Sequence, residues 1–167
     1  VDNDISLFFQ SVTLPEWSMY DHDPKIVAIT GGAGQAQTAA LIKHILTTVQ
    51  RPCQIATDAV LSLEPPVDNE VLVLGLSPAQ LELARILSPD ISVFLNGEPD
   101  GTAQQNDFAA MSRLFTGCAP ERAVIGANQV EGQYLENRLL QSGTPVIQVA
   151  DRKLTGQGWH VVTRKGF

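Results

Sequence analysis

The sequence contains few of the residues that hold metal ions or cross-link small folds. Its two cysteines, Cys53 and Cys118, are far apart and lie in no CxxC pattern. The three histidines are scattered and form no HExxH-type motif. The sequence therefore predicts no metal site, and we expect the cysteines to be small buried hydrophobic residues in a reducing compartment.

Positive charge and long apolar runs are also scarce. Eleven Lys and Arg stand against 18 Asp and Glu, which gives a formal net charge of −7. Nucleic-acid binding needs a basic footprint that this chain does not supply. No apolar run approaches the roughly 18 residues of a membrane span, and no signal-peptide pattern opens the sequence. We therefore expect a cytoplasmic protein with no nucleic-acid or membrane partner, and an unknown protein partner stays open.

From residue 25 onward the chain alternates between short apolar runs and segments with helical spacing. A chain of 167 residues suits one main domain, and we expect residues 1–24 to form a lead-in with a short helix over 2–10. The predicted strands are 25–30, 71–75, 91–95, 123–126 and 146–149, and the predicted helices are 37–49, 78–87, 108–115 and 130–140. This order predicts an α/β domain over 25–167, with a three-layer, mostly parallel sheet flanked by helices. The alternation at 159–163 predicts an edge strand or hairpin at the C-terminal end.

A glycine-rich turn follows the first predicted strand, where a phosphate-binding loop belongs. It carries Gly31, Gly32 and Gly34 before the helix. Backbone N–H groups at a helix N-terminus attract anions, but a working P-loop also needs a Lys for phosphate and a Ser or Thr for Mg²⁺. Those places hold Gln35 and Ala36. Local chemistry alone leaves open both a tight turn and a phosphate cradle.

The segment from Ala28 to Thr38, with the helix that follows, resembles the central ATPase domain of Mur ligases. Within that family the resemblance is nearest to the branch that adds D-glutamate. Segments 1–9, 90–96, 120–126 and 164–167 fit as well, so the resemblance covers essentially the whole chain. It implies a P-loop NTPase-like fold in which ATP and Mg²⁺ serve amide-bond formation.

The resemblance also implies that this chain has lost the groups that contact phosphate and metal. Gln35 stands where the family has its phosphate-binding Lys, and Ala36 where it has a metal-binding hydroxyl. Gly75 replaces a metal-binding Glu, Gly101 a His, and Met111 the carbamylated Lys. The family's glycine-rich substrate loop falls on 56–60, which keeps no glycine.

Some positions keep the family's residue types or backbone. The residual phosphate-loop candidates are Gly31, Gly32, Gly34, Gln35 and Thr38, and the other family-matching positions are Ser77, Gln80, Asn96, Asp100 and Arg113. The pattern predicts no catalytic residue, no metal ligand and no cofactor.

These losses lead to three readings of function. The first is a non-catalytic Mur-ligase-like domain with a binding, regulatory or scaffolding role linked to peptidoglycan synthesis. The second is a nucleotide- or anion-binding domain without turnover. The third is a fragment of an ATP-dependent D-glutamate ligase. Nucleotide would bind only under the second and third hypotheses, and ligation under the third would also require Mg²⁺.

Overall fold

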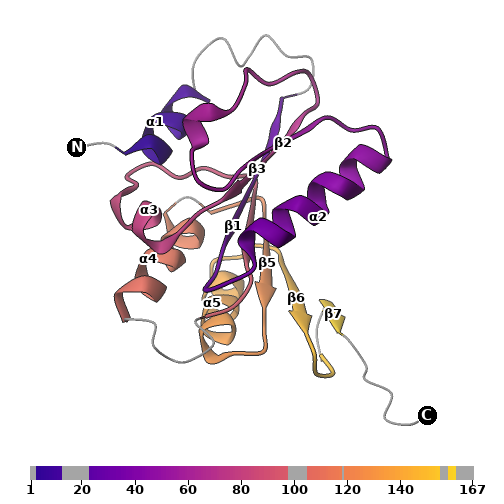
Figure 1. Ribbon diagram of the computed structural model, residues 1–167. Helices are drawn as coiled ribbons and strands as arrows, with labels where there is room; N and C mark the ends of the chain where they lie inside the picture. The colour runs from indigo at the N-terminus through magenta and orange to yellow at the C-terminus, as the bar shows by residue number, and fades with distance from the viewer. Residues whose placement is uncertain (1–2, 13–22, 98–104, 118, 155–157, 161–167) are drawn as a thin grey trace.

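The fold is a seven-stranded parallel sheet flanked by helices, as seen in a computed structural model (Figure 1). The structure describes residues 3–12, 23–97, 105–117, 119–154 and 158–160. The strand order is β2-β3-β1-β4-β5-β6-β7, and every neighbouring pair is parallel. The strands are β1 (Lys25–Thr30), β2 (Cys53–Ala56), β3 (Val71–Gly75), β4 (Ile91–Phe94), β5 (Arg122–Gly126), β6 (Val146–Ala150) and β7 (Gly158–His160).

The helices lie unequally on the two faces of the sheet. They are α1 (Asp4–Ser11), α2 (Gln35–Thr48), α3 (Pro78–Leu83), α4 (Gln105–Thr116) and α5 (Val130–Gln141), with a 3-10 turn, η2, at Val60–Ser62. One face packs against α1, η2, α3, α4 and α5 in the larger core cluster. The other face packs against α2 in the smaller cluster. Figure 1 shows α2 on its own side of the sheet, opposite α1, α3 and α4.

The central strands form because their apolar runs are buried on both faces. Every residue of β3 is buried, as are five of the six residues of β1. Alternate residues enter different clusters: Ile26 and Ala28 face the larger core, while Val27 and Ile29 face α2. Continuous apolar runs are the expected signature of a parallel sheet covered on both sides.

The predicted α/β architecture is confirmed, with one difference at a sheet edge. Of the predicted edge strand or hairpin near the C-terminal end, the structure has the edge strand, β7, which is parallel to β6. β2 was not predicted, because its sequence mixes polar and apolar residues and three of its four positions are only half-buried. Cys53 begins this strand and is half-buried rather than fully buried. Within the described residues, no helix is long and apolar enough to cross a membrane.

The first helix packs against the same core as the sheet. Asn3 caps α1 by accepting a hydrogen bond from the Ser6 N–H at 3.0 Å. Ile5, Phe8 and Phe9 are buried in the larger core cluster. The predicted short helix therefore forms, although the proposed boundary at residue 24 stays a prediction because 13–22 lie outside the described residues.

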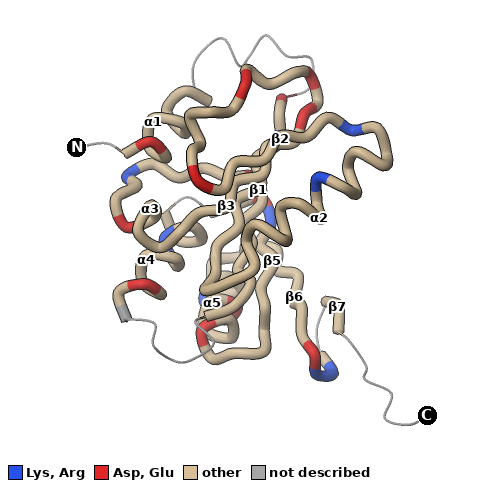
Figure 2. Tube along the Cα trace, viewed as in Figure 1, with Lys and Arg blue, Asp and Glu red and all other residues tan. Residues whose placement is uncertain are grey.

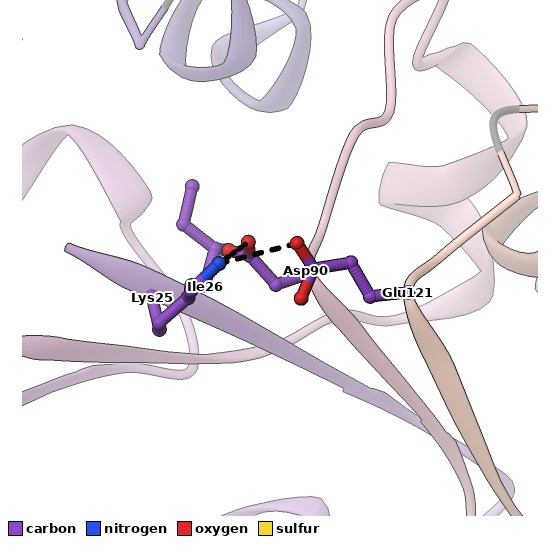
Figure 3. A network of polar contacts seen from close by, with 4 residues as sticks. All are labelled: Lys25, Ile26, Asp90 and Glu121. Carbon is purple, nitrogen blue, oxygen red and sulfur yellow. Dashed lines mark hydrogen bonds and ion pairs between the residues drawn. The ribbon is translucent and has the colours of Figure 1, made fainter. Parts of the chain in front are cut away.

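A cluster of charged residues lies at the amino-terminal ends of the central strands (Figure 3). The Asp90 carboxylate accepts hydrogen bonds from the Lys25 Nζ and from the Ile26 N–H, each at 2.7 Å. Glu121 lies 3.2 Å from the same ammonium group. The hydrogen bond to Asp90 raises the pKa of Lys25, and burial only partly opposes that rise. This cluster joins the starts of β1 and β4 at the edge opposite to the loop site.

Candidate functional site

The glycine-rich loop lies at the carboxyl end of β1, between that strand and α2. Gly34 is the N-cap of α2, with φ of 95°, and no side chain caps the helix. This left-handed conformation strongly favours glycine. A Cβ on Gly31 would lie 3.1 Å from the Asn96 carbonyl oxygen, so the loop packs tightly against the end of β4. The segment is therefore a tight turn that needs glycine at Gly34 and closely approaches Asn96 at Gly31.

Asn96 and Gln35 make hydrogen bonds to three polar groups of the loop backbone. The Asn96 carbonyl accepts a hydrogen bond from the Gly32 N–H at 2.9 Å, and the Asn96 side-chain oxygen accepts one from the Ala33 N–H at 3.1 Å. The Gln35 amide donates back to the Gly31 carbonyl. Thr38 lies in the first turn of α2, where its N–H bonds to Gly34 O at 2.9 Å. Gln35 thus closes the loop on itself at the place where the resemblance puts a phosphate-binding Lys.

A cavity of about 270 Å³ lies beside this loop, at the carboxyl ends of three strands. It is lined by Gln35, Ala36, Thr57, Asp58, Gly75, Leu76 and Ser77. Gly75 ends β3, and the other lining residues come after β1, β2 and β3, which are neighbours in the sheet. The position agrees with the rule that ligands of open α/β sheets sit outside the carboxyl ends of the strands.

The chemistry of the cavity does not suit a metal–phosphate pair. None of its seven lining residues, all within the described part of the chain, is Lys or Arg. Asp58 is the one ionisable lining residue, and a single carboxylate beside the helix N-terminus opposes an incoming phosphate. Across the described residues, no group of three or more His, Cys, Asp or Glu is placed to hold a metal ion.

The cavity wall is tightly packed around Gly75. A Cβ added at Gly75 would lie 3.1 Å from Thr57 Cγ2 and 3.4 Å from the Gln35 Cβ. The resemblance places a metal-binding Glu at this position. Thr57 would therefore have to give way before a longer side chain fitted.

The other family-matching residues serve the local fold. Ser77 and Gln80 form a capping box at the start of α3: the Gln80 N–H donates to Ser77 Oγ at 3.3 Å, and Gln80 Oε1 accepts from the Ser77 N–H at 3.0 Å. The Arg113 guanidinium donates to carbonyls at the end of α3, including that of Leu81 at 3.0 Å. Asp100 lies outside the described residues.

The sequence analysis singled out some of the residues that line the cavity and missed others. Gln35 and Ser77 were singled out and do line the cavity. Thr57 and Asp58 were missed, because β2 was not recognised and the residues after it had no strand to place them. Met111, which stands where the resemblance puts a carbamylated Lys, is 1% exposed and packs in the larger core.

Comparisons with known proteins show which sequences and folds the chain resembles. The chain is 47% identical over 176 residues to a UDP-N-acetylmuramoylalanine--D-glutamate ligase from Jannaschia sp. (strain CCS1), and 45% identical over 176 residues to one from Dinoroseobacter shibae. Each match covers all of this chain and 38% of the relative, so the chain spans well under half of the length of these curated relatives. No family model matches the chain.

Solved structures of the same kind share the fold. MurF ligase from Thermotoga maritima in complex with ADP matches 92% of this chain and 38% of its own, with a TM-score of 0.64 and 16% identity. A UDP-N-acetylmuramoyl-L-alanyl-D-glutamate--2,6-diaminopimelate ligase matches 90% of this chain and 36% of its own, with the same TM-score and 15% identity.

The fold and the loop at the end of β1 define a central domain of the Mur ligase type. The chain belongs to that family, and its sequence relatives are ligases of the D-glutamate-adding branch, MurD. The predicted resemblance is therefore confirmed.

Proposed function

We propose that this domain keeps the Mur ligase fold without the phosphate chemistry, and that it has a binding, regulatory or scaffolding role linked to peptidoglycan synthesis. The observation that carries the proposal is the closure of the loop by Gln35 onto Gly31. The absence of Lys and Arg from the seven residues around the neighbouring cavity supports it.

The energetic argument concerns the phosphate groups of ATP. A charge-assisted hydrogen bond contributes about 1.5–3 kcal/mol, and a metal ion contributes several kcal/mol of transition-state stabilisation. Gln35 supplies no charge, and Ala36 supplies no oxygen for a metal ion. Losing the Lys contact alone lowers affinity by about 10- to 150-fold, since each 1.4 kcal/mol is a factor of ten.

The test is calorimetric titration of the purified chain with ATP, in the presence of Mg²⁺ and in EDTA. We expect no heat of binding at millimolar nucleotide in either condition. The double variant Gln35→Lys/Ala36→Thr restores the two missing groups and should gain measurable affinity. Gln37→Lys is the matched control, because it adds the same charge at an exposed site further along α2. Mg²⁺-dependent binding by the unaltered chain would overturn the proposal.

A second candidate function is anion or nucleotide binding without turnover. Gly34 holds the loop in the left-handed shape of a phosphate cradle, and the start of α2 has no side-chain cap. These features favour an anion at the helix N-terminus. Binding of ATP that is equal with Mg²⁺ and with EDTA would support this candidate over the first.

The third candidate is that the chain corresponds to part of an ATP-dependent D-glutamate ligase. It is favoured by the 45–47% identity to enzymes named as such ligases along the whole chain. It requires Mg²⁺-ATP to bind at the loop after β1, and the same titration therefore decides it.

A further inference from the structure

A small cavity lies between the end of α4 and the segment that joins α3 to β4. Its volume is about 230 Å³. The residues that line it are Arg85, Ile86, Leu87, Ser88, Arg113 and Gly117. They lie where α4 ends and β4 is about to begin, toward the amino-terminal edge of the sheet, whereas the glycine-rich loop follows β1 at the opposite edge. The cavity is therefore separate from the candidate site described above.

The cavity concentrates positive charge in a chain that is acidic overall. Two of its six lining residues are arginines, and none is Asp or Glu. Figure 2 shows both positive and negative segments in the region of α3 and α4. The acidic residues of these two helices, Glu82 and Asp107, do not line the cavity. Two guanidinium groups around one cavity, with no carboxylate in its lining, favour an anion there.

Arg113 is held in place by the end of α3. Its guanidinium donates hydrogen bonds to the carbonyl oxygens of Leu81, Glu82 and Ala84, the first at 3.0 Å. An arginine side chain has five N–H donors, so these three bonds leave two donors for another acceptor. Because the bonds already restrict the side chain, an anion that binds Arg113 loses less conformational entropy.

Arg85 combines a fixed backbone with an unpaired side chain. Its backbone N–H donates to Ser6 Oγ at 2.9 Å, and Ser6 is fully buried. Among the described residues, the Arg85 guanidinium has no hydrogen-bond or ion-pair partner. By contrast, Arg51, Arg138 and Arg152 each donate to an oxygen atom of the chain. All the donors of the Arg85 guanidinium are therefore available to a bound molecule.

A hydroxyl group and two apolar side chains complete the cavity wall. The Ser88 hydroxyl has no hydrogen-bond partner within the described part of the chain, and a hydroxyl can donate to an anion. Leu87 is buried in the larger core, whereas Ile86 is 41% exposed. The cavity thus places polar donors beside an apolar surface, which suits a small organic molecule with a charged group.

We propose that this cavity binds a small molecule that carries an oxyanion, either a phosphate or a carboxylate. Arg85 and Arg113 would be the charged donors and Ser88 the neutral one. Guanidinium groups bind both kinds of oxyanion through paired N–H···O bonds. The molecule must be small, because pockets for drug-sized ligands have volumes of roughly 300–1,000 Å³. The inference does not depend on whether the loop after β1 binds phosphate.

The experiment titrates the whole ¹⁵N-labelled chain with inorganic phosphate and, in a separate series, with succinate. NMR spectra follow the backbone N–H groups of Ser88 and Gly117 and the side-chain Nε–H groups of Arg85 and Arg113. Sodium chloride keeps the ionic strength constant, because salt screens exposed charges. The N–H signals of residues 31–38 are followed in the same spectra, so that binding at the glycine-rich loop is observed separately.

Three variants separate a built site from general charge effects. Arg85→Gln removes the unpaired guanidinium, and the fold should survive because this side chain is exposed. Arg85→Lys keeps the positive charge but lacks the planar fork of donors. Arg138→Gln is the matched control, because it removes an exposed arginine of α5 that does not line the cavity. Circular dichroism verifies that each variant is folded.

We expect saturable shifts at Arg85, Ser88, Arg113 and Gly117 with at least one of the two anions. Arg85→Gln should weaken this binding about tenfold or more, as expected for the loss of a charge-assisted hydrogen bond. Arg85→Lys should weaken it less, and Arg138→Gln should leave it unchanged. Tighter binding of phosphate would support a phosphorylated ligand, and tighter binding of succinate would support a carboxylate.

Three results would contradict the proposal. The first is the absence of saturable shifts at the four cavity residues with either anion. The second is equal weakening by Arg85→Gln and Arg138→Gln, which would indicate a general effect of net charge. The third is a set of shifts confined to residues 31–38, which would assign anion binding to the glycine-rich loop alone.

Discussion

At the scale of single residues, the same side chains that match the Mur ligase pattern hold the domain together. Asn96 bonds two N–H groups of the loop, and Ser77 caps α3. Arg113 binds the carbonyls that end α3. These contacts would persist without any nucleotide, so agreement with a family motif at these positions is compatible with loss of phosphate binding.

Asp90 provides a residue-scale prediction about stability. Asp90→Ala leaves the Ile26 N–H without its 2.7 Å acceptor and should lower the free energy of unfolding by about 1–3 kcal/mol. Asp90→Asn keeps an acceptor oxygen and should cost less. Glu121→Ala is the control, because Glu121 is 68% exposed and an exposed ion pair contributes about 0–1 kcal/mol. Urea unfolding measures all three, and equal losses for Asp90→Ala and Glu121→Ala would refute this account of the cluster.

The raised pKa of Lys25 provides a prediction about pH. The ordinary pKa of a lysine, which the unfolded chain would have, is 10.5, and the folded-state pKa of Lys25 is higher. The charged Lys25 therefore stabilises the fold below pH 10.5, and this stabilisation is lost as the pH rises through the folded-state pKa. The difference in unfolding free energy between the unaltered chain and Lys25→Met should therefore be constant from pH 7 to 9 and shrink above about 10.5. The difference is expected to be small because the side chain is 43% exposed. A difference that shrinks below pH 9 would contradict the assignment.

At the scale of elements, strands that are apolar throughout can be predicted from the sequence, whereas strands of mixed composition cannot. β1, β3 and β4 were predicted because their buried runs are continuous. β2 is a half-buried edge strand with a mixed sequence, so the residues after it could not be placed. The spacing of Leu41, Ile45 and Val49 identified a helix, but spacing alone does not tell which apolar residues find a partner.

The junction between β5 and α5 provides an element-scale prediction. A Cβ on Gly132 would lie 1.9 Å from the Gly126 carbonyl oxygen, which belongs to the backbone. Gly132→Ala should therefore destabilise the fold by about 3 kcal/mol or more, despite the better helix propensity of Ala. Gly143→Ala is the control, because a Cβ at Gly143 would have no atom within 4 Å. Its one unfavourable feature is the φ of 78°, which should lower the free energy of unfolding by about 1–2 kcal/mol. If both variants had the same melting temperature, the close approach would be wrong.

At the scale of the whole molecule, the described residues form a parallel sheet whose two faces carry helices unequally. Every described strand is parallel, and the core on the α1 side is continuous. Among the described helices, α2 is the one that covers the other face, and it contacts β1, β2 and β3. The sequence predicted the layers, but the unequal helical cover could be seen only when the elements were placed in space.

The central claim is that the loop after β1 does not receive the phosphates of Mg²⁺-ATP. Amide hydrogen exchange over residues 31–38, measured in the unaltered chain with and without saturating Mg²⁺-ATP, tests it most directly. The account predicts the same exchange rates in both conditions, because the loop has no Lys for phosphate and Asn96 and Gln35 already bond Gly31, Gly32 and Ala33. Slower exchange at these residues that requires both Mg²⁺ and ATP would contradict the claim and support the ligase reading.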